Sequence, residues 1–294
     1  MSEFLTQISN LSVQIFAVAS MASVGLRYTL REILAPLRRF WAVVLALVAN
    51  FVAVPMLAFV ILKVIKLDRP YAIGLVLVAS AAGAPFVIKL TQLSGGNVAF
   101  SAGMLVLLVV VSIGYMPVVV PLLAPGSEIS ARAIAEPLVM TMLLPLVAGL
   151  LLKRFAPRLS ELLPLLGVVT NISLVLLVTL TFALNLTTLA GVLGTGAILA
   201  SLLFIAGAFA IGWLLGGVFG EHLRDEMALG TAQRNFAAAL VVATQSFDAP
   251  GVLVMSVVVS LATMAVLFPA AKLLNRRANR QSVIDNPRHL HPSE

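Results

Sequence analysis

Long apolar stretches dominate the chain and predict an all-α polytopic membrane protein. A helix needs about 20 apolar residues, each rising 1.5 Å, to cross the hydrocarbon core of a bilayer. The first stretch is the weakest, because Gln14, Ser20 and Ser23 interrupt it. We expect one membrane domain over residues 1–275 and a polar cytoplasmic tail over 276–294. The nine predicted spans lie at about 8–26, 41–65, 70–93, 97–124, 133–152, 162–186, 193–219, 226–247 and 250–274.

The composition supports this interpretation and excludes several classes of protein. Hydrophobic residues make up 61% of the 294 residues and charged residues only 11%, whereas a soluble domain carries about 25% charged residues. The chain has no cysteine, which excludes disulfides and thiolate metal sites. It also has no P-loop and no recognisable hydrolase or metalloprotease motif. We therefore expect neither a membrane enzyme nor an ATP-driven pump.

The basic residues indicate the orientation of the spans. Cytoplasmic connections usually carry an excess of Lys and Arg. In a nine-span protein the first connection, the fifth connection and the tail lie on one side, and these segments are basic. The second connection goes against the rule, but the sum predicts an outer N-terminus and a cytoplasmic C-terminus. The basic residues of the three segments are Arg27, Arg31, Arg38, Arg39, Lys153, Arg154, Arg158, Arg276, Arg277, Arg280 and Arg288.

An internal repeat relates the third and eighth spans. The segments LDRPYAIG (Leu67–Gly74) and LRDEMALG (Leu223–Gly230) are similar and lie 156 residues apart. Each opens a span rich in Ala and Gly, and each is followed by another long span. Because five spans separate the two copies, the copies enter the membrane from opposite sides. Inverted repeats of this kind build the midplane sites of many secondary transporters from broken helices.

Polar residues within these two spans mark the candidate site. Gly83 and Pro85 predict a break in the third span. A break in lipid is tolerated only where it is buried in protein or lines a cavity. In the eighth span Arg234 lies about 12 Å of helix rise from Glu226 at the mouth of the span. A central arginine costs at least ~2.5 kcal/mol by insertion scales, so it needs a specific role.

Structural explanations also exist for the polar residues. Backbone carbonyls of a broken helix can satisfy Arg234, and Lys89 lies close enough to the end of its span to reach the interface. Asn50 and Asn171 can bond neighbouring helices. Asn97 is a candidate N-cap of the fourth span.

Several segments together resemble the bile acid:sodium symporter superfamily. They are LVANFVAVPMLA (Leu47–Ala58), GGNVAFS (Gly95–Ser101) and GTAQRN (Gly230–Asn235), and the similarity covers nearly the whole chain in order. The resemblance implies a core domain with spans in 41–124 and 193–274, whose broken third and eighth spans cross. It also implies a panel domain with spans in 8–26 and 133–186, and a substrate crevice between the two domains.

The chain departs from this family where the family binds sodium. The match places Gly230 at the family's sodium-liganding Glu and Arg234 at its Gln, and Val87 and Ile88 at a Ser–Asn pair. A guanidinium offers donors but no acceptor. The usual two-sodium arrangement is therefore not expected to form. Arg234, with Lys89 as a second candidate, would supply fixed positive charge in its place.

The resulting expectation is a sodium-independent secondary transporter of a small or medium organic anion, such as a carboxylate or sulfonate, in a bacterial inner membrane. We expect bidentate contacts from Arg234 to the anion, and no cofactor, metal or nucleic acid. One alternative is a sodium-coupled symporter with a single altered site formed by Asn50, Asn97, Ser101 and Thr231. Another is a channel or sensor. The candidate substrate-binding residues are Arg234, Lys89, Gln233, Asn235, Thr231, Asn50, Asn97 and Ser101.

Overall fold

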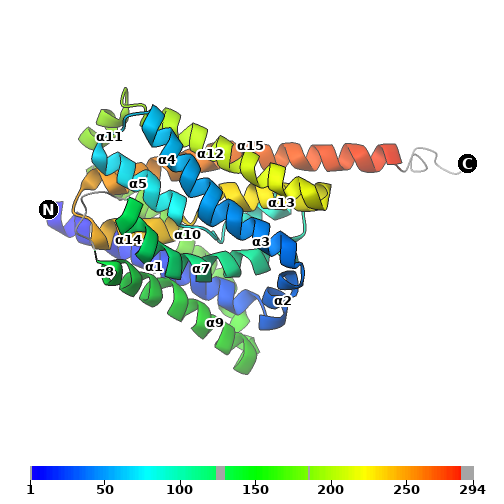
Figure 1. Ribbon diagram of the computed structural model, residues 1–294. Coiled ribbons are helices and arrows are strands. Elements are labelled where there is room, and N and C mark those ends of the chain that lie inside the picture. Colours follow the sequence, from blue (N-terminus) through cyan, green and yellow to red (C-terminus); the bar gives the residue numbers. More distant parts are fainter. Residues whose placement is uncertain (1, 124–129, 185, 286–294) are drawn as a thin grey trace, which may run out of the picture.

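A computed structural model describes residues 2–123, 130–184 and 186–285, which form helices and short connections with no strand (Figure 1). The first half of the fold comprises α1 (Ser2–Arg27), α2 (Leu30–Leu34), η1 (Ala35–Arg38), α3 (Phe40–Val48), η2 (Ala49–Ala53), α4 (Val54–Val64), α5 (Arg69–Ser80), α6 (Val87–Ser94) and α7 (Val98–Leu123). The second half comprises α8 (Ala131–Leu138), η3 (Val139–Leu143), α9 (Leu144–Phe155), η4 (Pro157–Leu162), α10 (Leu163–Leu184), α11 (Leu186–Val192), α12 (Ala197–Gly216), η5 (Gly217–Phe219), α13 (Glu221–Ala232), α14 (Phe236–Ser246) and α15 (Pro250–Asp285).

The predicted fold class is confirmed. Seven segments of the described chain are long and apolar enough to cross a membrane. The remaining two predicted spans, the third and the eighth, are the broken pairs α5–α6 and α13–α14. The segments α3–η2–α4 and α8–η3–α9 each run through a π-helical turn without interruption. The first span begins at Glu3, earlier than the predicted residue 8, because the small polar residues Ser9 and Ser12 are buried against neighbouring helices.

The first part of the predicted polar tail is helical. Helix α15 continues past residue 276 to Asp285. The added segment contains Arg, Ala and Gln, which are good helix formers. The rest of the predicted tail, residues 286–294, lies outside the described residues.

Large apolar side chains on the outside of the bundle mark a lipid-facing surface. Trp41 is 68% exposed, Phe155 is 74% exposed and Leu122 is 75% exposed. Water would not tolerate an apolar surface of this extent, but a bilayer does. The chain is therefore an integral membrane protein.

Two groups of helices pack closely among themselves. Helix α1 lies against α9 and α10, and a Cβ on Gly25 or Gly149 would collide with the backbone of the facing helix. In the other group α5 packs on α15, and α12 packs on both α13 and α15. The broken pairs belong to this second group.

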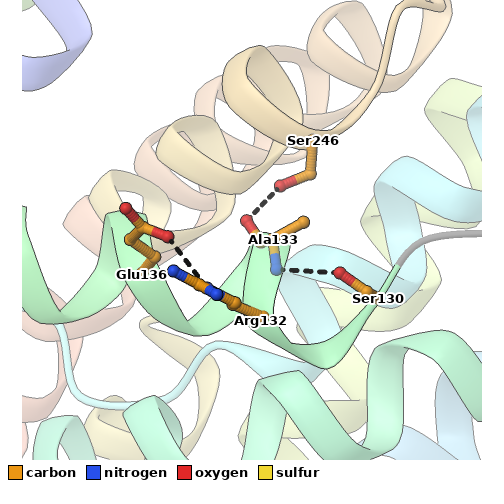
Figure 2. A network of polar contacts seen from close by, with 5 residues as sticks. All are labelled: Ser130, Arg132, Ala133, Glu136 and Ser246. Carbon is orange, nitrogen blue, oxygen red and sulfur yellow. Dashed lines mark hydrogen bonds and ion pairs between the residues drawn. The ribbon is translucent and has the colours of Figure 1, made fainter.

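Helices α8 and α14 touch at one end of the molecule (Figure 2). Ser130 caps α8 by accepting the N–H of Ala133 at 3.2 Å. The hydroxyl of Ser246 at the end of α14 donates to the carbonyl of Ala133 at 2.9 Å. Arg132 and Glu136 form an exposed ion pair on the same turn, with 3.5 Å between Nε and Oε2. This contact joins α14 to α8 at the end of the molecule where the N-terminus lies (Figure 1).

Candidate functional site

The third span breaks where the sequence predicts it. Helix α5 ends at Ser80, and α6 begins at Val87. Gly83 has φ +79°, and a Cβ there would lie 2.6 Å from the backbone nitrogen of Val109 in α7. Glycine is therefore required both by the backbone conformation and by the close approach of α7. Ser112 of α7 accepts the N–H of Ala82 at 2.8 Å and donates to its carbonyl at 3.0 Å, which satisfies the broken backbone.

The break in the eighth span crosses this one. Helix α13 ends at Ala232, and the side chain of Asn235 caps α14 by accepting the N–H of Ala238 at 3.1 Å. Asparagine is a favoured N-cap because its side-chain oxygen reaches the free N–H groups of the first turn. The backbone N–H of Asn235 donates to the carbonyl of Ala81 at 2.9 Å. The two broken helices therefore hydrogen-bond to each other at their breaks.

Arg234 lies at the centre of this crossing and is fully buried, with 0% of its surface exposed. Its Nε donates to the carbonyl of Val78 at 3.3 Å. Nη1 donates to Oδ1 of Asn50 at 2.6 Å and to the carbonyl of Thr231 at 3.3 Å. Nη2 donates to the carbonyls of Ala79 at 2.6 Å and Asn50 at 3.4 Å. All five N–H donors of the guanidinium have protein partners.

These partners show what the arginine holds together. Val78 and Ala79 belong to the last turn of α5, whose carbonyls carry the negative end of the helix dipole. Asn50 lies in the π-helical turn η2, and Thr231 lies in the last turn of α13. Arg234 thus joins three elements. The expected bidentate contacts from Arg234 to a substrate do not fit this geometry, because no N–H is left over for them.

A cavity of about 320 Å³ lies beside the crossing. Helices α1, α6, α10, α14 and α15 and both breaks contribute to its wall. Two exposed cations, Arg27 at the end of α1 and Lys89 in α6, border it, and its lining contains no Asp or Glu. The candidate residues Lys89, Gln233, Arg234 and Asn235 all lie in its wall, together with Pro85 of the break.

Buried polar atoms without a partner gather at this cavity. Among the described residues, six buried side-chain atoms make no hydrogen bond, and three of them belong to residues in the cavity wall. These are Oγ of Ser23, Oε1 of Gln233 and Nδ2 of Asn235. Buried polar groups normally have partners. Their concentration in one wall is typical of a ligand site.

A second cavity, of about 30 Å³, lies on the other side of the crossing. Its wall includes Asn50, Ser101 and Thr231, as well as Gly83. The predicted site residues therefore divide between two cavities. Asn97 lines neither: its Oδ1 accepts the N–H of Phe100 at 3.0 Å and caps α7.

Comparison with known proteins shows the family of this chain. The sequence signature of the Sodium Bile acid symporter family matches residues 14–192, which is more than half of the chain. The chain belongs to this family. The resemblance inferred from the sequence is thereby confirmed.

Proteins similar to this chain occur in plants and bacteria. It is 32% identical over 257 residues to a protein of Oryza sativa subsp. japonica named "Probable sodium/metabolite cotransporter BASS2, chloroplastic". It is 25% identical over 248 residues to the "Uncharacterized sodium-dependent transporter YocS" of Bacillus subtilis strain 168. These matches cover 84% and 80% of this chain, but 59% and 74% of the two relatives. The names describe transporters, not enzymes.

Sequence reasoning missed two residues of this family member's candidate sites. Arg27 is predicted only as a basic residue of the first connection, yet it borders the larger cavity. Glu226 was placed at the mouth of the eighth span, yet it is only 3% exposed and lines the smaller cavity. Its proximity to the predicted break, two turns before Arg234, was the available signal.

Proposed function

We propose that this protein is a secondary transporter of a small or medium organic anion of the carboxylate or sulfonate class, working by alternating access. The observation that carries the proposal is the cavity of about 320 Å³ at the crossing of the two broken helices. Its volume falls at the lower end of the range for small-molecule sites. Midplane crossings of half-helices are also where secondary transporters bind their substrates.

The charges around the cavity favour an anion. Arg27 and Lys89 are cationic, no Asp or Glu lies in the wall, and the buried guanidinium of Arg234 stands directly behind it. Attraction between charges is strong in a medium of low dielectric constant. The Nδ2 group of Asn235 has no partner and supplies a hydrogen-bond donor for a carboxylate or sulfonate oxygen.

Arg234 acts in this proposal as a fixed cation of the scaffold. The resemblance places it at a sodium-liganding Gln of the family, and three of its five bonds hold together the carbonyls of the two broken helices. We infer that the crossing forms without sodium at the usual two sites. The anion is attracted by the charge of Arg234 across the wall and accepts a hydrogen bond from Nδ2 of Asn235.

We assign the two parts that move relative to each other in alternating access to the proposed core and panel domains. The core domain comprises the spans in 41–124 and 193–274, and the panel domain comprises the spans in 8–26 and 133–186. The larger cavity lies between α1 and α10 of the panel and the crossing of the core. At the other end of the boundary between core and panel, the hydrogen bond from Ser246 to Ala133 joins the two domains. We place the N-terminus outside and the C-terminus in the cytoplasm of a bacterial inner membrane.

The test is thermal stabilisation of the purified protein by a panel of carboxylates and sulfonates, in sodium and in N-methylglucamine. Asn235→Asp is the decisive variant, because aspartate keeps the N-cap of α14 but replaces the donor with a negative charge. Lys89→Gln removes one cation of the wall, and Lys66→Gln, an exposed lysine in the α4–α5 connection, is its matched control.

An anion that stabilises wild type and Lys66→Gln in N-methylglucamine, but not Asn235→Asp, supports the proposal. Stabilisation that survives in Asn235→Asp and Lys89→Gln would place the anion elsewhere. Saturable counterflow in vesicles then separates a carrier from a channel or sensor. A requirement for sodium would favour the alternative, a sodium-coupled symporter, which agrees with the names of the relatives.

A further inference from the structure

Two buried amides flank Arg234 at the break of the eighth span. Gln233 and Asn235 are each 1% exposed, and both contribute to the wall of the larger cavity. Gln233 has an extended backbone, with φ −78° and ψ 99°. In an extended chain, residues two positions apart point to the same side, and the residue between them points to the other. This alternation directs the guanidinium of Arg234 into the crossing and leaves its two neighbours to shape the cavity.

Each amide has one atom committed inside the protein and one atom free. Oδ1 of Asn235 accepts the N–H of Ala238 at 3.1 Å, and Nε2 of Gln233 donates to the carbonyl of Arg234 at 3.5 Å. The reverse assignment of either amide would set two donors or two acceptors against each other. Nδ2 of Asn235 and Oε1 of Gln233 are buried and have no hydrogen-bond partner among the described residues. The wall therefore presents one fixed donor and one fixed acceptor.

A plain carboxylate or sulfonate satisfies only half of this pair. Its oxygens accept a hydrogen bond from Nδ2 of Asn235, but they carry no hydrogen for Oε1 of Gln233. An acceptor that stays buried without a donor lowers the affinity of whatever covers it. The anion that satisfies both atoms brings an O–H or N–H group of its own.

The spacing of the two residues fixes where that donor lies on the ligand. Residues two positions apart in an extended chain are separated by about 6.5 Å. A ligand that joins Nδ2 of Asn235 to Oε1 of Gln233 therefore carries its donor close to its anionic group. A hydroxyl on the carbon next to a carboxylate meets this requirement. An ammonium there is disfavoured, because the positive charge of Arg234 lies beside it and no Asp or Glu lines the cavity.

We propose that the substrate is a 2-hydroxycarboxylate whose hydroxyl donates to Oε1 of Gln233 while its carboxylate accepts from Nδ2 of Asn235. This inference rests on the function proposed above and makes Gln233 the residue that selects among organic anions. Apolar side chains line other parts of the same wall, including Leu174, Leu240 and Met264. They accommodate an aliphatic tail on the hydroxy acid.

The test compares matched acids that differ only at the second carbon. Thermal stabilisation of the purified protein is titrated with hexanoate, 2-oxohexanoate, 2-aminohexanoate and the separate enantiomers of 2-hydroxyhexanoate, in sodium and in N-methylglucamine. We expect one enantiomer of the hydroxy acid to bind about tenfold more tightly than each of the other three compounds, the effect of one hydrogen bond. Gln233→Met removes the acceptor, and we expect it to abolish this preference. Gln245→Met, at an exposed glutamine of α14, should retain it.

The outcomes separate this inference from the function on which it rests. Equal affinity of wild type for hexanoate and 2-hydroxyhexanoate overturns the hydroxy-acid preference and leaves the anion site standing. Stabilisation by none of the compounds overturns both. A preference that persists in Gln233→Met places the hydroxyl on another group and overturns the role of Gln233. If Gln233→Met does not fold, the comparison of the acids on wild type still decides whether the substrate needs a donor.

Discussion

Arg234 donates through Nη1 to Oδ1 of Asn50 at 2.6 Å, although the two residues lie 184 positions apart in the chain. The bond ties the break of the eighth span to the π-helical turn of the second. A π-helical turn leaves backbone carbonyls displaced from their regular partners, and the carbonyl of Asn50 also accepts from Arg234, at 3.4 Å. The pair therefore stabilises an irregular crossing at a depth where water cannot hydrogen-bond to the free backbone groups.

Replacement of Arg234 is expected to destabilise the fold strongly. Arg234→Met leaves the carbonyls of Val78, Ala79 and Thr231 without their side-chain donor, and each unsatisfied buried group costs about 1–3 kcal/mol. Arg234→Lys is not a rescue, because an ammonium cannot reproduce the planar fork of donors. We expect both variants to lose about 3 kcal/mol or more in thermal unfolding in detergent. Arg132→Gln, which removes an exposed arginine, should change stability by less than about 0.5 kcal/mol. An Arg234→Lys protein as stable as wild type would contradict the role given to the fork.

Asn50→Asp separates the structural role of Arg234 from its charge. The aspartate keeps an acceptor for Nη1 and compensates the guanidinium charge, so the crossing is retained better than in Asn50→Leu. The same compensation weakens the positive field at the larger cavity, and anion affinity should fall by roughly tenfold, about 1.4 kcal/mol. Titration of an identified anion against both variants measures the effect. Unchanged affinity in a folded Asn50→Asp protein would show that the charge of Arg234 does not attract the anion.

The two glycines Gly83 and Gly114 should respond in opposite ways to alanine. Gly83→Ala forces a side chain onto a φ of +79° and against the backbone of α7, and strain of this kind costs about 1–3 kcal/mol before any collision is counted. Gly114 lies within α7, and a Cβ there would meet no atom within 4 Å. Gly114→Ala should therefore be neutral or gain up to about 1 kcal/mol. Thermal unfolding of the two variants under identical conditions makes the comparison.

The sequence predicts those features of the site that depend on neighbouring residues in the chain. Gly83 and Pro85 lie two residues apart and together favour a break in a helix, and an arginine eight residues into an apolar span needs partners inside the protein. Both features are visible without a structure. The partners of Arg234 are not, because they are carbonyls of residues about 155 and 184 positions away. The burial of Glu226 is hidden from the sequence for the same reason, because it depends on the packing of the Gly96–Asn97 connection onto α13.

The helical extension beyond residue 276 shows a different limit. Hydropathy locates the end of a membrane span, but a helix continues into water as long as its residues favour helix. Residues after Leu274 are mostly polar, and α15 nevertheless reaches Asp285. The pattern of apolar residues therefore indicates the span but not the residue at which the helix ends.

Single cysteines can report the orientation of the chain, since the natural sequence has none. Asp248 lies exposed between α14 and α15, and Arg158 lies exposed in η4. With an outer N-terminus, Asp248→Cys should react with a membrane-impermeant maleimide in intact cells. Arg158→Cys should react only after the membrane is opened. The reverse pattern would invert the proposed topology and place the basic connections outside.

Helix α8 meets α14 at one end of the molecule, and the bond between Ser246 and Ala133 should keep that end closed (Figure 2). Ser246→Ala removes a bond worth about 0.5–1.5 kcal/mol, which shifts the balance between two conformations several-fold. The reporter is Gln92→Cys, an exposed position bordering the larger cavity. Its labelling should slow when Ser246→Ala is added, because the conformation closed around Gln92 becomes more populated. Ser130→Ala is the matched control: it removes the cap of α8 on the same turn but leaves the bond from Ser246 in place. If both substitutions slow labelling equally, the effect comes from a weakened α8, and the contact is not a gate.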